Sequence, residues 1–188
     1  MIVYLHGFIS SPQSHKATLL RDYLNQQGRG AEWLCPQIPP YPADAAALLS
    51  DCLAPLAGQR LCLVGSSLGG YYALHLAERL DCRAVLVNPA IRPYELLQKY
   101  LGEQRNPYTG TTFTLGPQHM QQLRELEVPS ISRPQRYWLL TQTGDEVLDA
   151  RQGIAKLAGA RQTVIEGGDH AFTGFESWLA AITGFADL

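Results

Sequence analysis

Short apolar runs recur along the chain, and each is followed by a longer stretch with the spacing of an amphipathic helix. The runs are bounded by turn residues and lie at 2–5, 31–35, 60–64, 84–87, 137–141 and 162–165. They are apolar at nearly every position, which is typical of strands covered on both faces. The stretches that favour helix lie at 14–27, 43–56, 68–80, 150–157 and 172–182. This alternation predicts an α/β fold, a three-layer sandwich with a mostly parallel sheet of about six strands.

The segment 91–135 interrupts the alternation. It is rich in Pro, Tyr, Thr and Gly around 106–110 and 115–117, with helical spacing at 94–101 and 118–126. Long excursions in compact domains are often functional, so we expect an insertion over one end of the sheet and consider it a candidate lid over a pocket. The alternative is a packed excursion that lines no pocket.

Length and composition indicate one folded domain over residues 1–188. Hydrophobic residues make up 46% of the chain and charged residues 17%, which excludes disorder as its main character. The formal net charge is −2, and no run of Lys or Arg is present. Nucleic-acid binders usually carry a basic patch, so nucleic acid is not an expected partner.

No apolar stretch approaches the roughly 18 residues that a membrane span requires, and Met1 leads directly into an apolar run without a basic flank. A soluble, cytoplasmic protein is therefore expected. Four cysteines are widely spaced and form no C-x-x-C pair. Reduced thiols are expected rather than a disulfide framework or a metal site.

The strongest chemical signal is Gly-Ser-Ser-Leu-Gly at 65–69, which directly follows one apolar run and directly precedes a helical stretch. This is the G-x-S-x-G pattern of a nucleophile elbow, in which a strained serine stands between a strand and a helix. Only Ser67 has glycine two positions away on both sides, because Ser66 has Val64 and Leu68 at those offsets. Ser67 is the candidate nucleophile.

A serine nucleophile needs a base, and histidine suits this role because its pKa lies near working pH. In this arrangement an acid and then a histidine follow the serine along the chain. Asp145 and His170 follow the last two predicted strands, at the sheet edge that also carries Ser67. Asp145 is the preferred acid, and three carboxylates nearby remain alternatives: Glu146, Asp149 and Asp169.

The remaining histidines compete poorly with His170 as the base. His6 lies in a turn after the first strand, which indicates a structural role, and His75 lies within the helix after the elbow. His15 and His119 have no acidic partner that the sequence identifies.

The oxyanion that forms during acyl transfer needs fixed donors, and backbone N–H groups supply them without reorganisation. The residue after the nucleophile, Leu68, provides one. The loop after the first strand provides the second, with Phe8 as the candidate and Ile9 as the alternative.

Several longer motifs accompany these residues: YLHGF at 4–8, PQIPPYP at 36–42, GSSLGGYY at 65–72, VNPA at 87–90, NPYTG at 106–110, QTGDEVLD at 142–149 and EGGDHAF at 166–172. With them the chain resembles the α/β-hydrolase superfamily, and within it the small bacterial YqiA-type esterases. The resemblance implies an esterase that acts on small acyl esters and on acyl-CoA thioesters. It places Ser67, Asp145 and His170 on the family's triad positions.

Compared with the larger superfamily, the chain opens at what corresponds to the third strand, so we expect the N-terminal antiparallel hairpin to be absent. The resulting hypothesis is a serine carboxylesterase or thioesterase with a small-molecule substrate and no metal or organic cofactor. Two alternatives stay open: an acyltransferase or peptidase that uses the same triad, and a hydrolase-shaped binding protein without activity. The oligomeric state is left open.

Overall fold

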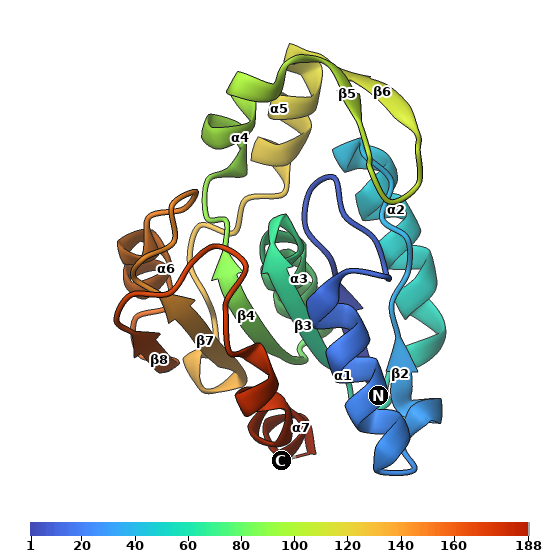
Figure 1. Ribbon diagram of the computed structural model, residues 1–188, viewed down its shortest axis with the longest axis vertical. Coiled ribbons are helices and arrows are strands. Elements are labelled where there is room, and N and C mark those ends of the chain that lie inside the picture. The colour runs from blue at the N-terminus through green and yellow to red at the C-terminus, as the bar shows by residue number, and fades with distance from the viewer. Residues whose placement is uncertain (188) are drawn as a thin grey trace.

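A computed structural model describes residues 1–187 and is built around one sheet of parallel strands. The strand order is β2-β1-β3-β4-β7-β8, and every neighbouring pair is parallel. The strands are β1 (Ile2–Leu5), β2 (Trp33–Leu34), β3 (Cys62–Ser67), β4 (Arg83–Pro89), β7 (Tyr137–Gln142) and β8 (Arg161–Ile165). The sequence prediction of a mostly parallel sheet of about six strands is confirmed (Figure 1).

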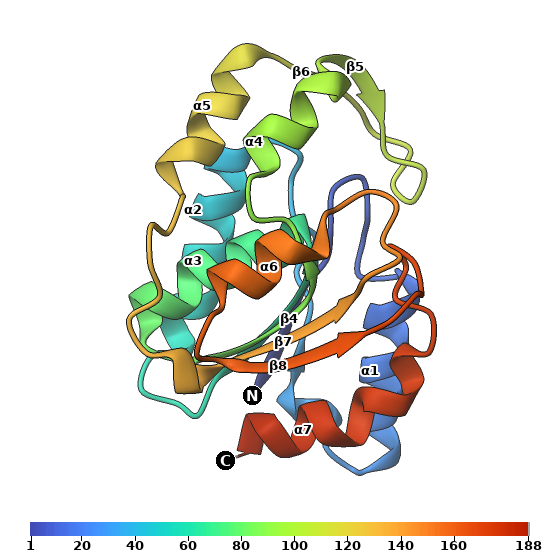
Figure 2. The same ribbon diagram turned by 90° about the vertical axis from the view of Figure 1, so that its left-hand side faces the viewer.

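Helices cover both faces of the sheet, as predicted (Figure 2). One face packs on α1 (His15–Gln26) and α7 (Leu179–Asp187), and the other packs on α2 (Pro42–Leu53), α3 (Leu68–Leu80) and α6 (Ala150–Lys156). Side chains alternate along a strand, so Ile2 and Tyr4 of β1 join the first apolar layer while Val3 and Leu5 join the second.

Three predicted elements have clearly different bounds. Strand β3 runs from Cys62 to Ser67, where the sequence predicted a strand at 60–64. Strand β2 has only two residues, because residues 30–32 form a 3-10 turn, η1 (Gly30–Glu32). The last helix begins at Leu179 and not at 172, after a 3-10 turn, η5 (Phe175–Trp178). Phe172 and Gly174 have φ angles of 59° and 86°, and this left-handed backbone cannot belong to a right-handed helix.

The insertion contains α4 (Pro93–Leu96), η3 (Leu97–Tyr100), β5 (Gly102–Arg105), β6 (Thr112–Leu115) and α5 (Pro117–Glu125). It lies beyond the carboxyl ends of the central strands (Figure 1). Both helical pieces were expected, but the antiparallel β5–β6 hairpin was not. Its signal was the alternation in β6, where Phe113 and Leu115 are buried and Thr112 and Thr114 are exposed.

Two short 3-10 turns complete the fold, η2 (Ala54–Leu56) and η4 (Pro134–Arg136). The four cysteines are free thiols; Cys62 is buried and the others are half-buried. Residues 1–187 contain no helix with the length and apolar character of a membrane span. The same residues contain no cluster of three or more His, Cys, Asp or Glu side chains arranged to hold a metal.

Candidate active site

Ser67 is the last residue of β3 and directly precedes α3. Its backbone has φ 55° and ψ −121°, a conformation that residues other than glycine rarely adopt. Such strain costs about 1–3 kcal/mol and persists only where the surroundings enforce it. The strand-turn-helix context predicted for the nucleophile elbow is therefore present, and it holds a half-buried Ser67 at the carboxyl edge of a central strand.

The flanking glycines are required by close backbone packing. A Cβ added at Gly65 would overlap the backbone of Gly69, and one added at Gly69 would overlap the carbonyl group of Leu5. The turn therefore brings β3, α3 and β1 closer together than any side chain allows. This explains why the motif has glycine two positions before and two positions after Ser67.

Asp145 and His170 come from the loops after β7 and β8, and their side chains are hydrogen-bonded. The Nδ1 atom of His170 lies 3.0 Å from Oδ1 and 2.9 Å from Oδ2 of Asp145. The Asp145 side chain is only 2% exposed, whereas that of His170 is 26% exposed. Oδ1 also accepts hydrogen bonds from the N–H groups of Val147 and Leu148, at 2.9 and 2.8 Å.

These contacts set the charge state of Asp145. Burial alone raises the pKa of a carboxyl group, but the hydrogen bonds from His170, Leu148 and Val147 outweigh it, so the pKa of Asp145 lies below its ordinary value. Asp145 is therefore ionised at neutral pH. An ionised acceptor beside Nδ1 keeps the proton on that nitrogen and leaves Nε2 free to act as a base.

The side chains of the three alternative acids make their hydrogen bonds to groups other than the His170 imidazole. Glu146 accepts a hydrogen bond from the backbone N–H of His170, at 3.0 Å. Asp149 caps α6 and pairs with Arg151. Asp169 accepts hydrogen bonds from the backbone and the hydroxyl group of Thr173.

Three of the other histidines have structural contacts. The Nε2 atom of His6 accepts a hydrogen bond from the backbone N–H of Ile38, at 3.0 Å. His75 lies 2.9 Å from the carbonyl oxygen of Leu126, and His119 accepts from the N–H of Gly116 at the start of α5. The structural role expected for His6 therefore agrees with its contacts.

The loop after β1 lies against Ser67. A Cβ added at Gly7 would stand 3.3 Å from the Ser67 Cβ and 3.8 Å from its Oγ. Among residues 1–187, the N–H groups of Phe8 and Leu68 donate no hydrogen bond. They are therefore available to an oxyanion on a substrate bound at Ser67.

Ser67 and His170 line one cavity of about 300 Å³. Within residues 1–187 the Ser67 hydroxyl makes no direct hydrogen bond to the imidazole. Such bonds are often long in free enzymes and tighten only when substrate binds. The structure thus brings Ser67, His170 and Asp145 to one edge of the sheet, with Ser67 and His170 facing a shared space.

Lys16 also lines this cavity, although none of the sequence motifs includes it. Its ammonium group donates a 2.6 Å hydrogen bond to the carbonyl oxygen of Ala171, the residue after His170. Burial lowers the pKa of Lys16, against the opposing attraction of Asp169 and Asp145. Its partner is a backbone carbonyl 155 residues away, which leaves no mark in the sequence.

A family model described as "Uncharacterised protein family (UPF0227)" matches residues 1–187. The chain belongs to the UPF0227 family. Among its curated relatives are the UPF0227 proteins YcfP of Escherichia coli and of Shigella boydii, each 31% identical over 100 residues. That match covers 52% of this chain and 55% of the relative, so the chain spans about half the length of the curated relatives it matches.

Solved structures of α/β hydrolases share the fold of this UPF0227 member. Mouse alpha/beta hydrolase domain-containing protein 10 has a TM-score of 0.73 at 18% identity, over 99% of this chain and 89% of that chain. Est1E from Butyrivibrio proteoclasticus has a TM-score of 0.70 at 12% identity, over 98% and 85%. The esterase domain of a Rhodothermus marinus protein has a TM-score of 0.62 at 18% identity, over 99% and 84%. The expected α/β-hydrolase fold is confirmed.

Proposed function

We propose that this protein is a serine esterase that hydrolyses small acyl esters through an acyl-enzyme on Ser67. The observation that carries the proposal is the hydrogen-bonded Asp145–His170 pair at the cavity that also contains the strained Ser67. The α/β-hydrolase fold raises the expectation of hydrolysis, and one structure with this fold is described as an esterase domain. The function itself is argued from the site.

The geometry supports the following sequence of steps. Nε2 of His170 takes the proton of the Ser67 hydroxyl as Oγ attacks the acyl carbon, and Asp145 stabilises the imidazolium that forms. The N–H groups of Phe8 and Leu68 donate to the oxyanion of the tetrahedral intermediate. His170 then gives the proton to the departing alcohol, and the acyl group remains on Ser67.

Water completes the cycle in the second half-reaction. His170 takes a proton from water as the water oxygen attacks the acyl carbon, and it returns that proton to Oγ as the acid leaves. A thiol leaves by the same route, so we extend the proposal to acyl-CoA thioesters, in agreement with the resemblance noted above. No step of this cycle draws on a group other than these side chains, these N–H groups and water.

The direct test replaces Ser67 with alanine and measures hydrolysis of aryl acetate and butyrate esters. Loss of a triad member costs up to about 10⁶-fold in kcat, so Ser67→Ala should reduce turnover by at least about 10³-fold. Ser50→Ala is the matched control, because the Ser50 hydroxyl only bonds the Ala46 carbonyl within α2. A Ser67→Ala variant within about tenfold of the wild type would contradict the proposal.

The same substrates, with amide and thioester analogues and added alcohol acceptors, separate the alternatives. A preference for amides or for transfer to an added alcohol indicates a peptidase or an acyltransferase. Binding without turnover indicates an inactive, hydrolase-shaped binding protein.

A further inference from the structure

A second cavity, of about 240 Å³, is also lined by the loop that follows β1. Residues 7–10 line both this cavity and the one that contains Ser67 and His170. The two cavities therefore adjoin at residues 7–10. We call these residues the oxyanion loop, because they include the Phe8 N–H group assigned to the oxyanion.

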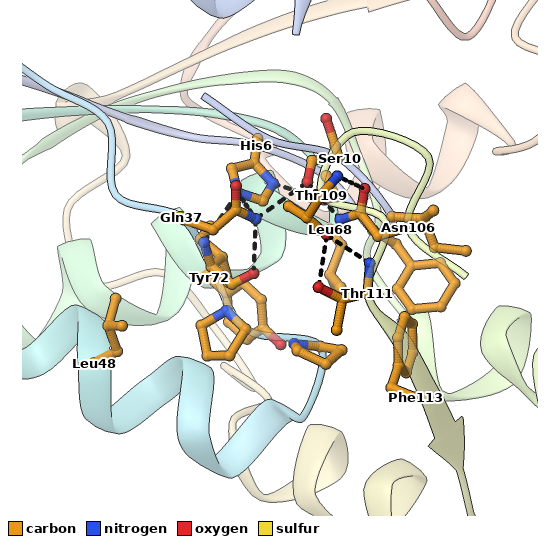
Figure 3. A pocket seen from close by; sticks show the side chains of 16 residues that line it. His6, Ser10, Gln37, Leu48, Leu68, Tyr72, Asn106, Thr109, Thr111 and Phe113 are labelled. Carbon is orange, nitrogen blue, oxygen red and sulfur yellow. Dashed lines mark hydrogen bonds between the residues drawn. The ribbon is translucent and has the colours of Figure 1, made fainter. Parts of the chain in front are cut away.

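The lining of the second cavity is mainly apolar. Its walls come from α2, α3, the loop before α2 and the β5–β6 hairpin (Figure 3). The apolar side chains include Phe8, Ile38, Leu48, Leu68, Tyr72 and Phe113. Leu68 connects the two sites, because its N–H group belongs to the proposed oxyanion hole and its side chain lines this cavity.

The position of His170 indicates which part of the substrate lies in each cavity. His170 must reach the leaving atom to protonate it, so the leaving group lies in the cavity that His170 lines. That cavity also contains polar groups from α1, including His15 and Lys16. The acyl chain must extend away from His170, and the second cavity, which His170 does not line, offers it an apolar surface.

We infer that the second cavity binds the acyl chain of the substrate and limits it to medium length. This inference rests on the proposed function. At about 30 Å³ for each water-sized group, 240 Å³ holds a chain of roughly eight carbons. Leu48 from α2 and Phe113 from β6 lie on opposite sides of this space (Figure 3) and bound the chain.

The hairpin of the insertion is fixed to the oxyanion loop. The Asn106 side-chain amide donates a 2.9 Å hydrogen bond to the carbonyl oxygen of Ser10. The Phe8 and Phe113 rings pack edge to face, with centroids 6.0 Å apart. A chain in the cavity therefore contacts the insertion and the oxyanion loop together, which makes the insertion a determinant of acyl specificity.

Hydrolysis of aryl esters from two to sixteen carbons tests this inference. Each methylene that enters the cavity should raise kcat/KM by about fourfold, with a maximum near eight carbons. Leu48→Trp fills the cavity and should lower the octanoyl-to-acetyl ratio of kcat/KM by at least tenfold. Phe113→Ala enlarges the cavity and should move the maximum to longer chains. Leu101→Trp is the control, because Leu101 is 41% exposed and should keep the wild-type ratio.

A binding experiment separates this inference from the proposed esterase activity. Ser67→Ala is titrated with octanoate, alone and in combination with Leu48→Trp, with circular dichroism to check folding. Octanoate binding that Leu48→Trp removes supports the cavity even where no ester is hydrolysed. Ester hydrolysis with a flat chain-length profile, unchanged in Leu48→Trp and Phe113→Ala, overturns the cavity assignment and leaves the esterase intact. A protein that shows neither ester hydrolysis nor octanoate binding contradicts both the proposed function and the cavity assignment.

Discussion

The Asp145 carboxylate lies within 3.0 Å of His170 Nδ1 through both of its oxygens, and its side chain is almost completely buried. The two residues come from different loops, 25 positions apart. The parallel sheet brings them together, because β7 and β8 are neighbours and end at the same edge. This contact leaves Nε2 as the imidazole nitrogen for the proposed role of base toward Ser67.

Replacing Asp145 with asparagine should therefore remove most of the activity while keeping the shape of the site. An asparagine amide can hold the imidazole in the wrong tautomer, and the corresponding change in a serine protease lowers kcat by about 10⁴-fold. Steady-state kinetics with an aryl butyrate measures the effect. Asp149→Asn is the control, because Asp149 pairs with Arg151 at the surface, and it should stay within about threefold of the wild type.

Asp145 should also make the stability of the folded protein depend on pH in the acidic range. Its pKa is lower in the folded protein than in the unfolded chain, where an aspartate has a pKa of about 3.9. The stabilisation is therefore complete above pH 4 and is lost as pH falls through the folded-state value. Urea unfolding of wild type and Asp145→Asn from pH 7 to pH 2.5 should show a stability difference that shrinks below pH 4. A difference that grows on acidification would contradict this assignment.

The elbow should not accept a side chain at Gly69. A Cβ at this position would overlap the Leu5 carbonyl group, so Gly69→Ala should force β1 and α3 apart and lower the free energy of unfolding by about 3 kcal/mol. The same variant should also lose its activity. Gly184→Ala in α7 is the opposite case, because nothing lies within 4 Å of the added Cβ. Alanine favours helix over glycine, so this variant should be more stable by about 0.5–1 kcal/mol. Thermal unfolding of both variants compares them directly.

Lys16 should act as a positioning residue for His170. Its ammonium group connects α1 to the carbonyl oxygen of Ala171, so Lys16→Met should loosen the loop that carries His170, the proposed base. A misplacement of about 1 Å can cost about 10²-fold in rate, and we expect kcat to fall by about tenfold or more. Lys16→Arg should recover part of the loss.

The control for Lys16 lies on the same helix. Arg21 is exposed and pairs with Asp22, so Arg21→Met should leave kcat and the hydrogen exchange of residues 169–172 unchanged. Faster exchange of that segment in Lys16→Met would confirm the positioning role. Wild-type kinetics and exchange in Lys16→Met would exclude it.

The sequence predicted those features of the site that chain geometry enforces. The elbow was visible because close approach of β3, α3 and β1 permits only glycine at 65 and 69. The sheet was visible because strands covered on both faces are apolar at every position. The insertion gave weaker signals: the β5–β6 hairpin has only one alternating strand, and β5 reads Gly-Glu-Gln-Arg.

Contacts between residues that lie far apart in the sequence could not be predicted from local motifs. Lys16 binds a backbone carbonyl, which any residue could supply, so nothing near Ala171 marks the pair. The second cavity combines residues from positions 6 to 113. Its lining depends on contacts between the insertion and the loop after β1, and no local sequence pattern predicts those contacts.

Covalent labelling measures whether Ser67 is a nucleophile and whether His170 activates it. The wild-type protein is treated with a fluorophosphonate, digested, and mapped by mass spectrometry. We expect one adduct, on Ser67 and not on the adjacent Ser66, and labelling that is slower by at least about 10²-fold in His170→Gln. No adduct on Ser67, or equal labelling rates in the wild type and His170→Gln, would contradict the proposed mechanism.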